Sequence, residues 1–110
     1  MKAFRNYNFE FDKNEKKILT NFSKQVLKQL EGDNRFLNET KSFNSIISKL
    51  GESSETIKFT KDEYFKLVNQ LKENLKFLKP KAEKGFFIKR WLYKSVYLQY
   101  KNLVETHFSD

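Results

Sequence analysis

One short segment occurs twice in the chain, and this repeat constrains the fold more than any other feature of the sequence. The segment FEFDKNEKKILTN, residues 9–21, returns 48 positions later as IKFTKDEYFKLVN, residues 57–69. When the alignment is extended to twenty residues, eight positions are identical, which is more than chance pairing gives in a lysine-rich chain. The sequence therefore predicts an internal duplication, with copies at residues 7–50 and 56–108.

Both copies open with alternating apolar residues, which predict a short strand in each. These residues are Tyr7, Phe9 and Phe11 in the first copy, and Ile57 and Phe59 in the second. A polar cap with an acidic residue three positions later follows each strand, as Asp12 with Glu15 and as Thr60 with Glu63. This spacing is that of the capping box, so a helix is expected to begin after each cap.

Apolar residues on one helical face follow both caps. They are Ile18, Leu19, Phe22, Val26, Leu27 and Leu30 in the first copy, and Tyr64, Leu67, Val68, Leu71, Leu75 and Leu78 in the second. A further helix is expected over residues 35–50, and a final one after Pro80, running to about Phe108. The predicted fold is mainly α (α+β): one compact four-helix domain over residues 1–110, with a short two-stranded β ribbon, built as a pseudo-two-fold duplication of strand-helix-helix units.

The residue types argue against several kinds of catalytic and ligand-binding site. The chain has no cysteine, which excludes disulfides, thiolate zinc sites and a cysteine nucleophile. Its three glycines form no phosphate-binding loop, and the single histidine, His107, has no partners for a catalytic triad. Capping explains Asp62 and Glu63 without an acid/base role. We therefore expect no enzyme, no cofactor and no metal. No segment has the apolar length of a signal peptide or a membrane span, so a cytoplasmic protein without membrane insertion is expected.

Positive charge is concentrated in one part of the chain. Residues 64–101 hold ten basic and two acidic residues, a net charge of +8, which equals the net charge of the whole protein. Such clustering is typical of a protein that binds an anionic partner, either an acidic protein surface or a nucleic acid. The alternative is a solvated lysine coat that reflects genome coding bias.

The last helix contains more large apolar residues than a core face needs. Ile88, Leu92, Val96, Tyr100 and Leu103 form the expected core face. Phe87, Trp91 and Leu98 lie on another line of the helix, and the neighbouring basic residues are Lys89, Arg90, Lys94 and Lys101. These seven residues are the candidate partner-binding set. The alternative is a helix buried nearly all round, in which Trp91 is simply part of the core.

Together these features favour a non-catalytic protein-binding module, such as a small inhibitor, adaptor or immunity-type factor, that acts through its basic, aromatic C-terminal helix. An acidic protein is the preferred partner, and a homodimer through the final helix is a second option. The alternative function is a basic nucleic-acid-binding regulator encoded by a phage or mobile element. In size and composition alone, the chain resembles small basic helical proteins of Gram-positive bacteria and their phages.

Overall fold

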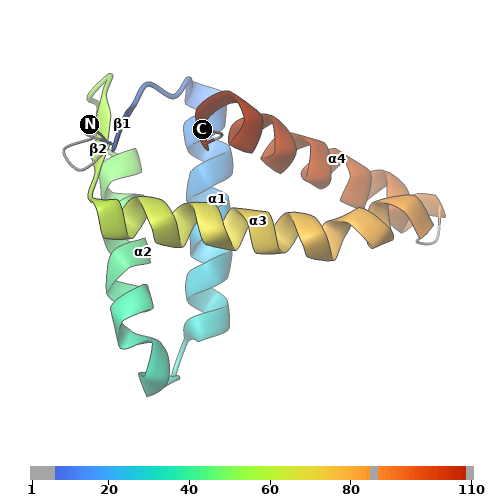
Figure 1. The fold of residues 1–110 in the computed structure, drawn as a ribbon, viewed down its shortest axis with the longest axis horizontal. Coiled ribbons are helices and arrows are strands. Elements are labelled where there is room, and N and C mark those ends of the chain that lie inside the picture. Colours follow the sequence, from blue (N-terminus) through green and yellow to red (C-terminus); the bar gives the residue numbers. More distant parts are fainter. Residues whose placement is uncertain (1–6, 85–86, 109–110) are drawn as a thin grey trace. The chain divides into compact units, whose positions relative to one another are not determined.

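The computed structural model describes residues 7–84 and 87–108 and contains four α-helices and two short strands (Figure 1). In chain order the elements are β1 (Tyr7–Phe9), α1 (Lys13–Leu30), the 3₁₀ turn η2 (Asn34–Phe36), α2 (Leu37–Leu50), β2 (Ile57–Phe59), α3 (Lys61–Lys84), α4 (Phe87–Leu103) and the π-helical turn η3 (Val104–Phe108). The predicted mainly helical fold, with four helices and a two-stranded ribbon, is confirmed.

The chain divides after Leu67 into two compact units. The first unit holds β1, α1, α2, β2 and the first two turns of α3. The second holds the remainder of α3 together with α4 and η3. The single domain that the sequence predicts stays a prediction.

The core of the first unit lies between α1 and α2, which run antiparallel side by side (Figure 1). Leu19, Phe22 and Val26 recur at helical spacing on α1 and are buried. Phe43, Ile46 and Leu50 form the corresponding buried residues of α2, at i, i+3 and i+7. Each helix thus buries one apolar face, which on α2 leaves Leu37 exposed.

The two strands pair antiparallel, with Tyr7 opposite Phe59 and Phe9 opposite Ile57. A ribbon of three residues per strand is marginal by itself. Stacked rings support it: Tyr7 lies 4.4 Å from Tyr64 between ring centroids, and Phe9 lies 5.5 Å from Phe11. Aromatic pairs of this kind contribute about 0.5–1.5 kcal/mol each beyond their area. The ribbon is therefore held by side chains as much as by its backbone.

Both predicted capping boxes are present. The N–H of Glu15 donates to Asp12 Oδ1 at 2.7 Å, and the N–H of Asp12 donates to Glu15 Oε1 at 3.0 Å. The second box repeats this arrangement, with 3.1 Å from the Glu63 N–H to Thr60 Oγ1 and 2.8 Å from the Thr60 N–H to Glu63 Oε1. The caps satisfy N–H groups that a helix start otherwise leaves unpaired.

The two copies are alike at their caps but differ at their strands. β2 ends one residue before its cap at Thr60, whereas β1 ends three residues before its cap at Asp12, which leaves Phe11 outside the strand. A pseudo-two-fold relation between the copies stays a prediction.

Pro80 lies inside α3 and does not end it, so the expected boundary at Pro80 is wrong. The proline ring removes the N–H that would bond to the carbonyl of residue 76, yet α3 continues for one more turn, through Lys81 to Lys84. Lysine, alanine and glutamate favour helix strongly, which explains why this turn persists.

Candidate interaction surface

Helix α4 exposes large apolar side chains. Trp91 is 74% exposed and Leu98 is 44% exposed, while Tyr100 and Leu103 are buried. The exposed pair lies seven residues apart, two turns along one face, whereas the buried pair belongs to the opposite side of the helix. Trp91 is therefore not a core residue, and the alternative of a helix buried all round does not describe α4.

Leu92 departs from the expected core face. It is 54% exposed, although the sequence places it with Val96 and Tyr100. A projection at 100° per residue puts Leu92 at the edge of that face, about 80° from Tyr100. The side chains at the centre of the face are enough to bury this side of the helix. Leu92 thus adds to the apolar surface of α4.

A surface groove runs beside this face. Its volume is about 410 Å³, and Leu98 lies at it together with Lys94 and Tyr97 of the same helix. Lys79, Ala82 and Glu83 of α3 complete the lining. The groove thus brings two lysines and one glutamate around apolar atoms of Leu98 and Tyr97, entirely within the second unit.

A further exposed aromatic residue of this unit is Phe77 on α3, which is 61% exposed. The ammonium of Lys81 lies 4.6 Å from the centroid of the Phe77 ring and 5.5 Å from that of Tyr93. Cation–π contacts at exposed sites contribute about 0.5–1 kcal/mol. Lys81 therefore links a ring of α3 to a ring of α4 while leaving most of Phe77 accessible.

The sequence-based candidate set is only partly described. Lys94 and Lys101 are exposed on α4, as are Trp91 and Leu98. The residues Phe87, Lys89 and Arg90 belong to α4, but their side chains lie outside the part of the structure that is described. The candidate set from the sequence does not include Phe77, Lys79 or Glu83. Phe77 could have been found, because it is a large apolar residue outside the core stripe of its helix.

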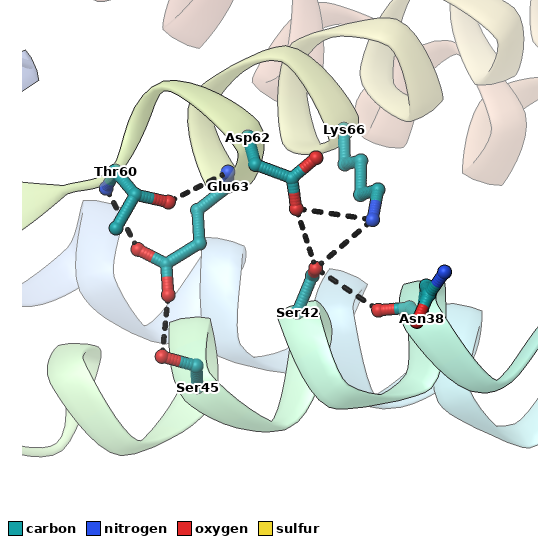
Figure 2. A network of polar contacts seen from close by, with 7 residues as sticks. All are labelled: Asn38, Ser42, Ser45, Thr60, Asp62, Glu63 and Lys66. Atoms are coloured by element: carbon teal, nitrogen blue, oxygen red, sulfur yellow. Dashed lines mark hydrogen bonds and ion pairs between the residues drawn. The ribbon is translucent and has the colours of Figure 1, made fainter.

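A separate polar network joins α2 to the start of α3 (Figure 2). Its centre is Glu63, which is only 5% exposed. Besides the capping bond from Thr60, its carboxylate accepts hydrogen bonds from the Ser45 hydroxyl and from Lys49 Nζ, the latter at 2.5 Å. Glu63 was predicted as a cap alone. Its partners on α2 lie 14 and 18 residues away in the chain, so only the tertiary structure brings them together.

The environment of Glu63 favours its charged form. Burial by itself raises the pKa of this carboxyl, but the hydrogen bonds from Lys49, Ser45 and the backbone outweigh it and hold the pKa below its usual range. Both carboxylate oxygens already accept hydrogen bonds, and a carboxylate with a lowered pKa is a weak general base. The arrangement fastens α3 to α2.

A second part of the network connects the buried Ser42 to the exposed Asp62. The Ser42 hydroxyl lies 2.9 Å from Asp62 Oδ2 and 3.0 Å from the carbonyl oxygen of Asn38, and it accepts from Lys66 Nζ at 3.2 Å (Figure 2). Lys66 also pairs with Asp62 at 3.0 Å. Hydrogen bonds from Lys66 and Ser42 lower the pKa of the exposed Asp62 carboxyl. These contacts extend the link between α2 and α3 by one turn.

Over residues 7–84 and 87–108, no three histidine or acidic side chains cluster closely enough to hold a metal ion. No helix of this described part has the length and apolar character to cross a membrane. The chain matches no protein-family model, no curated protein and no solved structure. A function for this chain is therefore proposed from its own side chains and their arrangement.

Proposed function

We propose that this protein is a non-catalytic protein-binding module that acts by occupying an acidic surface of its partner through α4. The observation that carries this proposal is the exposure of Trp91, 74%, on a helix face that also exposes Leu98 and is flanked by Lys94 and Lys101. Tryptophan is enriched among the residues that dominate binding energy at protein interfaces. A small inhibitor, adaptor or immunity-type factor would use such a surface.

The chemistry of the surface supports a protein partner. A central apolar patch with a charged rim is the usual composition of an interface. The large apolar residues that are exposed in the described part of the second unit are Phe77, Trp91, Leu92 and Leu98, of which Trp91 and Leu98 share one face of α4. The lysine rim would steer an acidic partner toward the patch and speed association at low salt.

Site-specific photocrosslinking tests this function. A photoreactive amino acid is introduced at Leu98 of the full chain, and at Leu37 as a control, because Leu37 is a similarly exposed leucine (55%) in the first unit. After irradiation in nuclease-treated lysate of the source cells, we expect one discrete protein adduct from position 98 and none from position 37. Equal adducts at both positions, or none at either, would contradict the proposal.

Nucleic-acid binding is the second candidate function. The observation that favours it is the pairing of two exposed aromatic side chains, Phe77 and Trp91, with a lysine-rich unit, since aromatic rings and cations together bind single strands. A crosslinked adduct at position 98 that disappears on nuclease treatment would establish this candidate instead. Its affinity should fall steeply with salt concentration.

A further inference from the structure

We infer that the groove between α3 and α4 binds an acidic amphipathic helix of the partner, an inference that rests on the proposed function. The first support is the order of side chains along α4. Trp91, Lys94, Leu98 and Lys101 follow at i, i+3, i+7 and i+10, and all four are exposed. The two apolar residues lie about 10 Å apart along the helix axis. An opposing helix repeats its own apolar residues at the same interval.

The second support is the shape and lining of the groove. Ala82 is almost fully buried, and its small side chain together with the Tyr97 ring leaves room beside Leu98. A volume of about 410 Å³ accommodates the apolar side chains of one helix face, while the body of the bound helix stays outside. The groove therefore suits a helix that lies along it.

The third support is charge. Lys79 stands on the α3 side of the groove and Lys94 on the α4 side, with Glu83 as the one acidic lining residue. Residues 68–110 as a whole hold nine basic and four acidic residues, a net charge of +5. Aspartate and glutamate on both flanks of an apolar stripe would meet both lysines. This pattern is an acidic amphipathic helix.

The same charges argue against two other occupants. A second copy of this chain, bound through the same face, would bring Lys79 and Lys94 against an equally basic surface. A nucleic-acid backbone would meet the Glu83 carboxylate inside the groove and would leave the side chain of Leu98 without an apolar partner. An acidic helix avoids both conflicts.

The experiment uses Trp91, the one tryptophan of the chain, as its reporter. The probe is a synthetic peptide of about 15 residues with leucines at i, i+3 or i+4, and i+7 and glutamates on both flanks. A matched peptide has lysine in place of every glutamate. We expect the acidic peptide to shift the Trp91 emission to shorter wavelength and the lysine peptide to leave it unchanged. Lys94→Glu should weaken acidic-peptide binding about tenfold.

Control variants localise the effect. Lys41→Glu reverses an exposed lysine on α2 and should leave peptide affinity unchanged, and circular dichroism checks that every variant is folded. Leu98→Ser should weaken binding, whereas Leu37→Ser should not.

Four outcomes would overturn the inference. Equal binding of the two peptides would show that charge complementarity does not select the occupant. Binding that survives both Lys94→Glu and Leu98→Ser would place the peptide elsewhere. If neither peptide binds, the occupant is not a helix of this kind, while a protein adduct from position 98 would still support the proposed function. A single-stranded oligonucleotide that shifts Trp91 emission when the acidic peptide does not would overturn the inference and the proposed function together.

Discussion

Glu63→Ala should destabilise the protein about three times as much as the same change at the matching position of the first capping box, Glu15→Ala. Both glutamates accept the N–H of their capping residue. Glu63 also accepts two hydrogen bonds from α2, from Ser45 and Lys49, at a site that is 5% exposed. The two variants therefore separate the cap from the buried network.

The magnitude follows from the contacts. Loss of a capping interaction costs about 1 kcal/mol, which is the expectation for Glu15→Ala. Each additional hydrogen bond to the Glu63 carboxylate contributes about 1 kcal/mol, below the roughly 1.5–3 kcal/mol of hydrogen bonds to charged groups, because Lys49 is partly exposed and can be solvated. Glu63→Ala should thus lower the free energy of unfolding by about 3 kcal/mol, a large share of the usual 5–15 kcal/mol.

Urea unfolding followed by circular dichroism measures both variants. The pH dependence gives a second check, because the pKa of Glu63 is lower in the folded state than in the unfolded state. Between these two pKa values the unfolded chain binds more protons, so the stability from Glu63 is present above the unfolded pKa and is lost as pH falls through the folded pKa. The gap between wild type and Glu63→Ala should close at low pH. Equal destabilisation by Glu15→Ala and Glu63→Ala, or a gap that does not change with pH, would refute this reasoning.

Substitutions at Ser23, Gly32 and Trp91 test three other features by the same unfolding assay. Ser23→Ala should raise stability by about 1 kcal/mol, since its buried hydroxyl has no hydrogen-bond partner among the described residues and alanine favours helix; a loss of stability would mean that the hydroxyl is satisfied. Gly32→Ala should destabilise by about 1–2 kcal/mol through backbone strain alone, because Gly32 has φ +78° and a Cβ there would meet no atom within 4 Å; Gly32→Asn should lose less. Trp91→Ala should change stability by less than about 0.5 kcal/mol, whereas Phe43→Ala, in the core, should lose about 3–5 kcal/mol; similar losses for both would place Trp91 in the core after all.

Local features of the sequence predicted local structure well. The caps at Asp12 and Thr60 were correctly placed because a capping box is defined by residues three positions apart. Helical faces on α1 and α3 followed from apolar spacing in the same way. The end of α3 was not predicted at the right residue, because one proline in the last turns removes a single hydrogen bond and its neighbours favour helix.

Features that depend on distant residues were not predictable. The role of Glu63 depends on Ser45 and Lys49, and no pattern near residue 63 indicates them. The exposure of Leu92 depends on how much of the α4 face is covered by other residues. A helical projection does not determine whether a residue at the edge of that face is buried. The candidate surface was predictable in part, as an excess of large apolar residues on α4, but its groove needs the α3 side chains Lys79 and Glu83.

The pairing of β1 with β2 has a consequence for the order of folding. The whole α1–α2 hairpin lies between these strands in the chain, so the ribbon closes a long loop, while the two helices meet across a short turn. Long loops lose more chain entropy on closure, and the contacts that close them tend to form late. We expect Phe59→Leu to accelerate unfolding with little effect on the refolding rate, and Ile46→Val to slow refolding, in stopped-flow measurements. A ribbon that forms last would also open first, which makes the strand pair the expected starting point of unfolding in the first unit.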